Sequence, residues 1–297
     1  MPRAEEIKDR LPRWALDAAD TGTRAYALAT SALRPPPDFL IAGTKRGGTT
    51  SLFNYLLMHP GVLGLFPQTR GKKSTDFFFK EQARGRRWYR SHFHTETHRR
   101  RLAARTGGRV VGGEASPYYM WDPRVAPQAH SLNPRLSAIV LLRDPVERAW
   151  SHYQERVHMG VEPLSFAAAL EAEALRTDGE LERMLADPGY YSEAHDWYSY
   201  RARGVYLPQL TAWRSAFPDS QLLVLRSEDM YADVQSAFDD VCRFLDLAPF
   251  RLPTTRTFNS ITRSTMPEDC RAELREYYRP ANQELELACG RSFGWQE

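Results

Sequence analysis

The stretch over residues 39–58 constrains this chain more than any other. It opens with an apolar run, residues 39–42, that is short enough for a buried β-strand. A glycine-rich turn over residues 43–48 comes next. The apolar residues after the turn have helical spacing: Leu52, Phe53, Leu56 and Leu57. A strand, a glycine turn and a helix N-terminus in this order form a cradle for phosphate, because free backbone N–H groups and the helix dipole both favour an anion.

The glycine spacing indicates which kind of phosphate site this is. A nucleoside-triphosphatase P-loop reads G-x-x-x-x-G-K-[ST]. Gly43 and Gly48 keep the glycine spacing and Thr50 takes the Ser/Thr position, but Thr49 takes the lysine position. The stretch has one lysine, Lys45, inside the turn. Such a loop suits a kinase or ATPase poorly, although it can hold a shorter 5′-anion with Lys45 near the group being transferred. Taken alone, it also fits a tight structural turn.

A second stretch, residues 138–153, again reads as a buried strand that runs into a helix. Pro145 lies near the expected helix start, and Asp144 is placed to cap it. Arg143 ends the strand, and Ser151 follows about two helical turns later. Strands alternate with helices along the chain, which predicts an α/β fold with one P-loop-type parallel sheet and helices on both faces. Both loops then follow the carboxyl ends of strands, where such sheets bind ligands.

Together, these stretches resemble the sulfotransferases that use 3′-phosphoadenosine 5′-phosphosulfate (PAPS). Residues 44–50 look like their 5′-phosphosulfate loop. Residues 143–151, which read R-D-P-V-E-R-A-W-S, look like their 3′-phosphate motif, R-D-P-x-x-R-x-x-S. Three further segments, residues 113–119, 274–283 and 290–295, look like the heparan sulfate branch of the family and its bacterial relatives.

The resemblance implies a role in donor binding for several residues. Lys45 is expected to stabilise the leaving phosphate and the sulfuryl group. Arg143 and Ser151 are expected to hold the 3′-phosphate, Arg143 through a charge-assisted fork, whereas Arg148 has the alternative of lying on the helix surface. The other donor-binding candidates are Arg46, Gly47, Gly48, Thr49, Thr50, Ser51 and, near the C-terminus, Arg263. We expect no metal, because no Asp/Glu/His cluster in the sequence demands one.

The general base is where the chain departs from the heparan sulfate branch. Those relatives carry a glutamate two residues before a His-Phe-Phe triplet. Here the triplet is residues 76–78 and the glutamate position is Ser74. Asp76 is therefore the first candidate for the catalytic base, and Glu114 is the second. Each has a structural alternative: Asp76 as a helix N-cap, and Glu114 as the partner of an arginine.

A positively charged residue of the related enzymes is also missing from its usual position in this chain. The relatives have a lysine in an E-K-[ST]-P motif, and this chain has Ala115 there. Lys72 or Lys73 is expected to replace that cation. Eight arginines over residues 84–105 concentrate further positive charge between the two motifs. They form either a solvated helix face or a surface for an anionic ligand.

Composition excludes several classes of function. The 297 residues are 42% hydrophobic and 26% charged, which is an ordinary globular composition. A net charge of +3 gives no general field for nucleic acid. No run approaches the roughly 18 apolar residues of a membrane span, and no signal-peptide pattern follows the first residues. Three widely spaced cysteines without metal-ligand spacing favour a cytoplasmic protein.

We therefore expect a helical extension over residues 1–34, ended by a proline run, and a sulfotransferase domain over residues 35–297. The extension is expected to pack on the domain, to pair subunits in a homodimer, or to lie on a membrane surface. The predicted reaction is sulfuryl transfer from PAPS to a hydroxyl or amine of a glycan, glycolipid or glycosylated small molecule. The alternative is a P-loop nucleotide kinase or a non-catalytic nucleotide binder, against which Thr49 and the motif at residues 143–151 argue.

Overall fold

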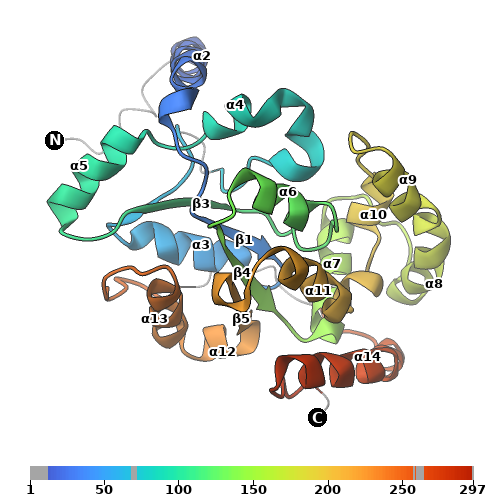
Figure 1. Ribbon diagram of the computed structural model, residues 1–297. Coiled ribbons are helices and arrows are strands. Elements are labelled where there is room, and N and C mark those ends of the chain that lie inside the picture. Colours follow the sequence, from blue (N-terminus) through green and yellow to red (C-terminus); the bar gives the residue numbers. More distant parts are fainter. Residues whose placement is uncertain (1–12, 68–71, 257, 259–263, 296–297) are drawn as a thin grey trace.

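The computed structural model describes residues 13–67, 72–256, 258 and 264–295 (Figure 1). Its centre is one sheet of five strands in the order β2-β3-β1-β4-β5, with every adjacent pair parallel. The predicted parallel α/β sheet is confirmed. The strands are β1 (Phe39–Gly43), β2 (Val62–Leu63), β3 (Val111–Ala115), β4 (Ser137–Leu142) and β5 (Leu222–Arg226).

Helices surround this sheet (Figure 1). Those before β4 are α2 (Arg13–Ala29), η1 (Ser31–Leu33), α3 (Thr49–Met58), η2 (Phe77–Glu81), η3 (Gln82–Arg84), α4 (Gly85–Arg90), α5 (Glu96–Thr106) and α6 (Val125–Leu132). Those after β4 are α7 (Pro145–His158), α8 (Phe166–Thr177), α9 (Glu180–Ala186), α10 (Glu193–Trp197), η4 (Ala202–Gly204), α11 (Tyr206–Ala216), η5 (Asp219–Gln221), α12 (Ser227–Ala232), α13 (Val234–Phe244) and α14 (Glu268–Cys289).

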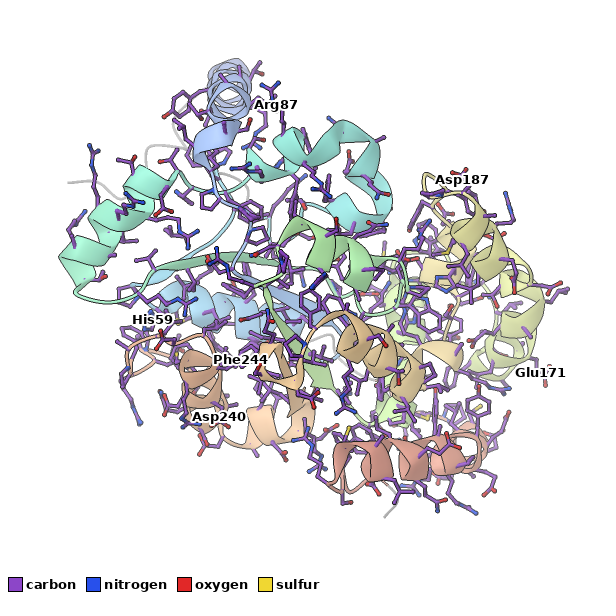
Figure 2. All side chains as sticks on the ribbon, viewed as in Figure 1. His59, Arg87, Glu171, Asp187, Asp240 and Phe244 are labelled. Carbon is purple, nitrogen blue, oxygen red and sulfur yellow. The ribbon has the colours of Figure 1, made fainter. Side chains whose placement is uncertain are left out.

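Both faces of the sheet are buried, as an all-parallel sheet requires. Leu40 and Val140 point into one core, which α6 and α11 complete. Ile41 and Leu141 point into the other core, which α3 and α13 complete. The end of α3 is held beside α13, because the Nε2 of His59 lies 2.9 Å from the carbonyl oxygen of Ala248 (Figure 2). Because successive side chains of a strand point to opposite faces of the sheet, each of these strands packs against helices on both faces.

The strand order brings the two predicted phosphate loops together. β1 pairs with β3 on one side and β4 on the other, so the chain changes direction across the sheet at β1. The loops that leave β1 and β4 therefore start at neighbouring carboxyl ends, where open α/β sheets bind ligands. The backbone N–H of Thr44 donates to the carbonyl oxygen of Leu141 over 2.9 Å, which ties the start of the first loop to β4.

Helix boundaries mostly follow the sequence signals. The carboxylate of Asp144 accepts from the N–H of Val146 over 2.8 Å, and Pro145 begins α7, so the predicted cap is confirmed. Gly290, a residue type common just after a helix, ends α14 with a φ of 63°. The apolar run over residues 62–66 predicts a strand of that length, but β2 ends at Leu63. The prolines of residues 117–127 predict that the next helix begins near residue 128, but α6 starts at Val125, because Pro127 lies in its first turn, where a missing N–H costs little.

Helix α2 of the N-terminal segment packs against α4. Ala27 is fully buried, and the Nε of Arg90 donates to the carbonyl oxygen of Arg34 over 2.6 Å. Figure 1 shows α2 standing above α4, outside the layer of helices that covers the sheet directly. Within residues 13–67, 72–256, 258 and 264–295, no helix has the length and apolar character needed to cross a membrane.

Candidate active site

The loop between β1 and α3 is built around two glycines that the structure requires. A Cβ on Gly47 would lie 2.6 Å from the carbonyl oxygen of Leu141. Gly48 has a φ of 99°, and a Cβ there would lie 2.8 Å from the hydroxyl of Tyr231. Gly48 is also the N-cap of α3, and no side chain caps that helix. The loop backbone therefore approaches its surroundings closely and leads into a helix N-terminus suited to an anion.

Lys45 lies in this loop and is buried with 9% of its surface exposed. Its Nζ is 3.5 Å from Oδ1 of Asp196 and 3.6 Å from Oε2 of Glu155. Burial lowers the pKa of Lys45 to about 8, and the charge of Asp196 opposes this shift. Burial by itself raises the pKa of Asp196, yet the charges of Lys45 and Arg203 hold that pKa well below its ordinary value. The two carboxylates thus stabilise a buried ammonium.

The two sequence motifs meet at Arg46. Its Nε donates to Oγ of Ser151 over 2.9 Å, and its Nη1 lies 3.1 Å from Oε1 of Glu155. Nη1 of Arg143 donates to the carbonyl oxygen of Arg46 over 3.0 Å. The backbone of Arg46 has a φ of 69°, an uncommon value for a residue with a side chain. These bonds hold it there, so Arg143 and Ser151 of the second motif lie against the first loop.

A second lysine reaches the start of α3. Nζ of Lys73 lies 2.5 Å from Oγ1 of Thr50 and 3.4 Å from Oγ1 of Thr49. Burial lowers the pKa of Lys73 to about 8, while the charges of Glu155 and Asp76 raise it. Of the two lysines expected to replace the missing cation, Lys73 is therefore the one whose ammonium lies at the helix N-terminus.

The hydroxyl of Ser51 has other hydrogen-bond partners than the hydroxyls of Thr49 and Thr50. Ser51 is fully buried, donates from Oγ to the carbonyl oxygen of Phe258 and accepts from the N–H of Phe258, both over 3.2 Å. Within the described residues its hydroxyl thus fastens residue 258 to α3. Arg263, the candidate near the C-terminus, lies outside the described residues.

Asp76 lies beside a cavity of about 230 Å³ that Ser74 also lines. Oγ of Ser74 donates to Oδ1 of Asp76 over 2.6 Å. Asp76 precedes η2, and its carbonyl oxygen accepts from the N–H groups of Lys80 and Glu81, but its side chain makes no capping bond. The carboxylate is therefore directed to Ser74 and the cavity wall and does not cap the helix.

Glu114, the second candidate base, is completely enclosed, with 0% of its surface exposed. One oxygen accepts from the hydroxyls of Tyr89 and Tyr119 over 2.7 and 2.9 Å, and the other accepts from the N–H of Thr75 over 2.6 Å. Burial raises the pKa of Glu114 to about 7, against the effect of these hydrogen bonds. Its hydrogen-bond partners are tyrosines and a backbone amide, so the expected arginine partner was wrong.

Sequence reasoning missed several polar residues around Lys45. Glu155 lies one helical turn after Ser151, and that spacing could have identified it. Asp196 comes from α10 and Arg203 from η4, where no sequence signal marked them. Arg148 is fully buried and donates to the carbonyl oxygen of Tyr200, so its alternative as a helix-surface residue was wrong.

The arginines of residues 84–105 mostly have structural partners or face solvent. Arg99 pairs with Asp38 over 2.6 Å, and Arg100 pairs with Glu96 over 2.9 Å. Arg87 is exposed and lies at the outer edge of the molecule (Figure 2). Helices α4 and α5, which carry most of these arginines, therefore present largely a solvated face.

Comparison with known proteins agrees with this geometry. A model of the sulfotransferase domain matches residues 36–273. The chain is 24% identical over 331 residues to the membrane-associated sulfotransferase kil1 of Dictyostelium discoideum, covering 88% of this chain and 66% of that protein. It is 26% identical over 283 residues to human heparan sulfate glucosamine 3-O-sulfotransferase 6, covering 87% of this chain and 73% of that protein.

A third relative and one solved structure extend the comparison. Human bifunctional heparan sulfate N-deacetylase/N-sulfotransferase 3 is 27% identical, over 84% of this chain but only 29% of its own length. The chain thus spans just under two thirds of the first relative and less than a third of this one. The crystal structure of a sulfotransferase from Alicyclobacillus acidocaldarius is 29% identical with a TM-score of 0.65, covering 88% of this chain and 99% of that one. Because the family model covers most of the chain, this protein belongs to the sulfotransferase family.

Proposed function

We propose that this protein transfers the sulfuryl group of PAPS to a hydroxyl or amine of a glycan, glycolipid or glycosylated small molecule. The observation that carries the proposal is the meeting of the two motifs at the carboxyl ends of β1 and β4. There, the side chain of Arg46 donates to Ser151 and Arg143 donates to the carbonyl oxygen of Arg46, the residue that directly follows the buried Lys45. The names of the relatives, among them a heparan sulfate glucosamine 3-O-sulfotransferase, support an acceptor of the glycan type.

The residues present fit such a donor. The start of α3 lacks a side-chain cap, and Gly47 and Gly48 leave no room for a Cβ, so the backbone N–H groups at this turn suit a 5′-phosphosulfate. Thr49 and Thr50, already in contact with the ammonium of Lys73, contribute hydroxyls at the same turn. Arg143 and Ser151 would hold the 3′-phosphate, and the bond between Arg46 and Ser151 would be exchanged for bonds to it.

In this assignment, Lys45 and Lys73 act on the charge that develops during transfer. The acceptor atom bonds to sulfur while the bond from sulfur to the bridging phosphate oxygen breaks, and the acceptor proton passes to a base. Lys45 would stabilise the bridging oxygen as it becomes anionic, where a buried cation has a large effect. Asp76 is the proposed base, because it lines a cavity, its charge acts on Lys73, and within the described region its carboxylate accepts a hydrogen bond from a single side chain.

We also propose a cytoplasmic location, which the three free cysteines on α13 and α14 favour. The name of one relative describes a membrane-associated protein. Homodimer formation and the division into an extension over residues 1–34 and a domain over residues 35–297 stay predictions.

Thermal unfolding with two nucleotides tests the proposed function. Adenosine 3′,5′-bisphosphate at a hundredfold excess over its dissociation constant should add about 2.7 kcal/mol to the free energy of unfolding, and ATP with magnesium should add little. Arg143→Ala should weaken bisphosphate binding about tenfold to a hundredfold, because it leaves a phosphate without its charged partner. Stabilisation by ATP alone would support the nucleotide kinase alternative and sink this proposal.

A further inference from the structure

A single carboxylate joins the two cations of the loop between β1 and α3. Oε1 of Glu155 lies 3.1 Å from Nη1 of Arg46, and Oε2 of Glu155 lies 3.6 Å from Nζ of Lys45. All three side chains are mostly buried, so solvent and salt screen these ion pairs less than they screen pairs at the surface. One side chain of α7 therefore spans two consecutive residues of the loop that is proposed to hold the donor.

Glu155 is itself fixed by the next residue of its helix. Nη2 of the buried Arg156 lies 2.8 Å from Oε2 of Glu155. Ser151, one turn earlier on α7, accepts from Nε of Arg46 over 2.9 Å. Arg46 is thus held at two successive turns of α7, once by a neutral hydroxyl and once by a carboxylate. The bond to Ser151 is the one proposed to be exchanged for the 3′-phosphate, so Glu155 is the contact that continues to hold the side chain of Arg46 to α7.

The second carboxylate at Lys45 has a different set of partners. Asp196 lies 3.5 Å from Lys45 and 3.2 Å from Arg203, and it accepts from the hydroxyl of Tyr191 over 2.8 Å. Arg46 is not among the partners of Asp196 within the described residues. Asp196 therefore fixes one cation of the loop from the side of α10, whereas Glu155 joins both cations of the loop to α7.

The charged and titratable groups that face Lys45 come from three elements. They are Glu155, Arg156 and the neutral His152 of α7, Asp196 of α10 and Arg203 of η4. Burial lowers the pKa of Lys45 to about 8, while the charge of Glu155 opposes this shift. The charges of Glu155 and Asp76 likewise raise the pKa of Lys73, against the effects of burial and of Arg46.

Glu155 stays ionised over the pH range in which these lysines titrate. Burial by itself raises the pKa of Glu155, yet the charge of Lys45 and the hydrogen bond from Arg156 hold that pKa below its ordinary value. The same carboxylate therefore fixes the position of Lys45 and favours the ammonium form of both lysines.

We propose that Glu155 is a positioning residue of the donor site, whose carboxylate holds the side chains of Lys45 and Arg46 in place for the phosphates of the donor. This inference rests on the proposed function. Glu155 touches neither donor nor acceptor in this assignment and acts through the two cations. Because its charge also favours the ammonium forms of Lys45 and Lys73, Glu155 extends the use of the donor toward higher pH.

The pH profile of kcat/KM for PAPS tests the inference in Glu155→Gln. Its alkaline midpoint should fall by about one pH unit below that of the wild-type protein, because an opposite charge this close to an ammonium has been removed. At pH 6, where the lysines are ionised in both proteins, kcat/KM should still be about threefold to tenfold lower, because the cations are less well placed. At pH 8 the loss should be about fivefold larger than at pH 6.

Three results in a folded Glu155→Gln variant would overturn the inference. They are an unchanged midpoint, an unchanged kcat/KM at pH 6, and tighter binding of adenosine 3′,5′-bisphosphate in titration calorimetry. The last of these would mean that the carboxylate competes with the donor for the two cations.

A conservative variant and a matched ion pair serve as controls. Glu155→Asp keeps the charge on a shorter side chain, so its midpoint and its kcat/KM at pH 6 should fall between those of the other two proteins. Asp38 pairs with Arg99 over 2.6 Å with a side chain 25% exposed, against 23% for Glu155, but it precedes β1 at the opposite edge of the sheet. Asp38→Asn should therefore keep the wild-type profile, and a shift of the same size there would overturn the inference. If Glu155→Gln does not fold, Glu155→Asp decides: a lower midpoint and a loss of kcat/KM support the inference, and wild-type kinetics reject it.

A labelling measurement separates this inference from the proposed function. If adenosine 3′,5′-bisphosphate fails to stabilise the protein and no acceptor is sulfated, the proposed function has failed. Acetylation by acetic anhydride, followed by peptide mass spectrometry, then reports the ionisation of Lys45 and Lys73 without any donor. In Glu155→Gln the labelling midpoints of both lysines should move to lower pH, that of Lys45 by about one unit, and labelling of the exposed Lys80 should stay the same. A Lys45 midpoint that stays at the wild-type value rejects the inference.

Discussion

At the scale of single residues, Lys45 combines burial with charge inside the candidate site. Its ammonium is held by Asp196 and Glu155 inside a loop whose glycines fix its position. Lys45→Ala should lower kcat by about 10² to 10³ while changing bisphosphate affinity much less, because a charge at the bridging oxygen matters most in the transition state. Steady-state kinetics and titration calorimetry measure the two effects, with the exposed Lys80→Ala as control. Turnover that survives while only donor binding drops would make Lys45 an anchor.

The lowered lysine pKa values predict how activity depends on pH. Lys45 and Lys73 have pKa values of about 8 in the free protein, below their ordinary value of 10.5. Each ammonium is therefore present below pH 8 and is lost as pH rises through that value. The kcat/KM for the donor, which reports the free enzyme, should fall above about pH 8. In Lys73→Arg the arginine keeps its charge over this pH range. The remaining decrease of kcat/KM should then come from Lys45 alone. A profile that stays flat to about pH 9.5 would contradict the role of both cations.

Two single-residue variants test which carboxylate acts as the base. Asp76→Asn should keep the fold and bisphosphate binding but lose on the order of 10² to 10⁴ in kcat. Glu114→Gln should have a smaller effect on kcat, because Glu114 has 0% exposure and its oxygens already accept three hydrogen bonds. The reverse ranking would move the base to Glu114. Near-normal turnover in both variants would mean that the acceptor needs no protein base.

The ionisation of Glu114 should instead affect how the free energy of unfolding depends on pH. Its folded pKa of about 7 lies above its ordinary value of 4.5, so the folded state retains the proton that the unfolded chain releases. The contribution of Glu114 to the free energy of unfolding is therefore fully present below pH 4.5. It decreases as pH rises to about 7, by roughly 3 kcal/mol in order of magnitude. Urea midpoints at pH 5 and pH 8 should differ in the wild-type protein and differ less in Glu114→Gln. Equal wild-type midpoints would refute the linkage.

At the scale of elements, the turn between β1 and α3 depends on Gly48. Its φ of 99° and the 2.8 Å approach of Tyr231 to a Cβ both oppose any side chain. Gly107 is a matched control, since it has a φ of 70° but nothing within 4 Å of a Cβ. Gly107→Ala should cost about 1 kcal/mol for the left-handed backbone alone, whereas Gly48→Ala should cost more and also weaken bisphosphate binding. Equal losses of stability in the two variants, with binding intact, would mean that the loop can move to accept a methyl group.

At the scale of the whole molecule, the strand order makes one ligand bridge two distant segments. β1 and β4 are adjacent, so α3 and α7 begin side by side although their motifs lie far apart in the chain. Saturating adenosine 3′,5′-bisphosphate should slow amide hydrogen exchange at the first turns of both helices and leave α5 and α13 unchanged. In Arg143→Ala the protection should persist at α3 and weaken at α7. Protection of α3 alone in the wild-type protein would disprove the 3′-phosphate assignment.

The sequence by itself determined the elements and the donor motifs of this protein. Apolar runs, glycines and caps are local signals, and they located β1, α3, β4 and α7 closely. Residues such as Lys45, Arg143 and Ser151 could be assigned because each belongs to a short motif with its own spacing. Their roles with a bound donor stay predictions, but their proximity follows from adjacent parallel strands.

Only the tertiary structure decided which other residues share the site. Asp196 reaches Lys45 from α10, and Arg203 of η4 pairs with Asp196; the positions of these two short helices depend on packing and not on local sequence. Glu114 carries the same side chain whether it is a base or a buried acceptor, and only its enclosure by Tyr89 and Tyr119 distinguishes the two. Arg24 lines the cavity because α2 docks on α4. Local patterns specify elements, whereas burial and long-range contact set the chemistry of a side chain, and those depend on the whole fold.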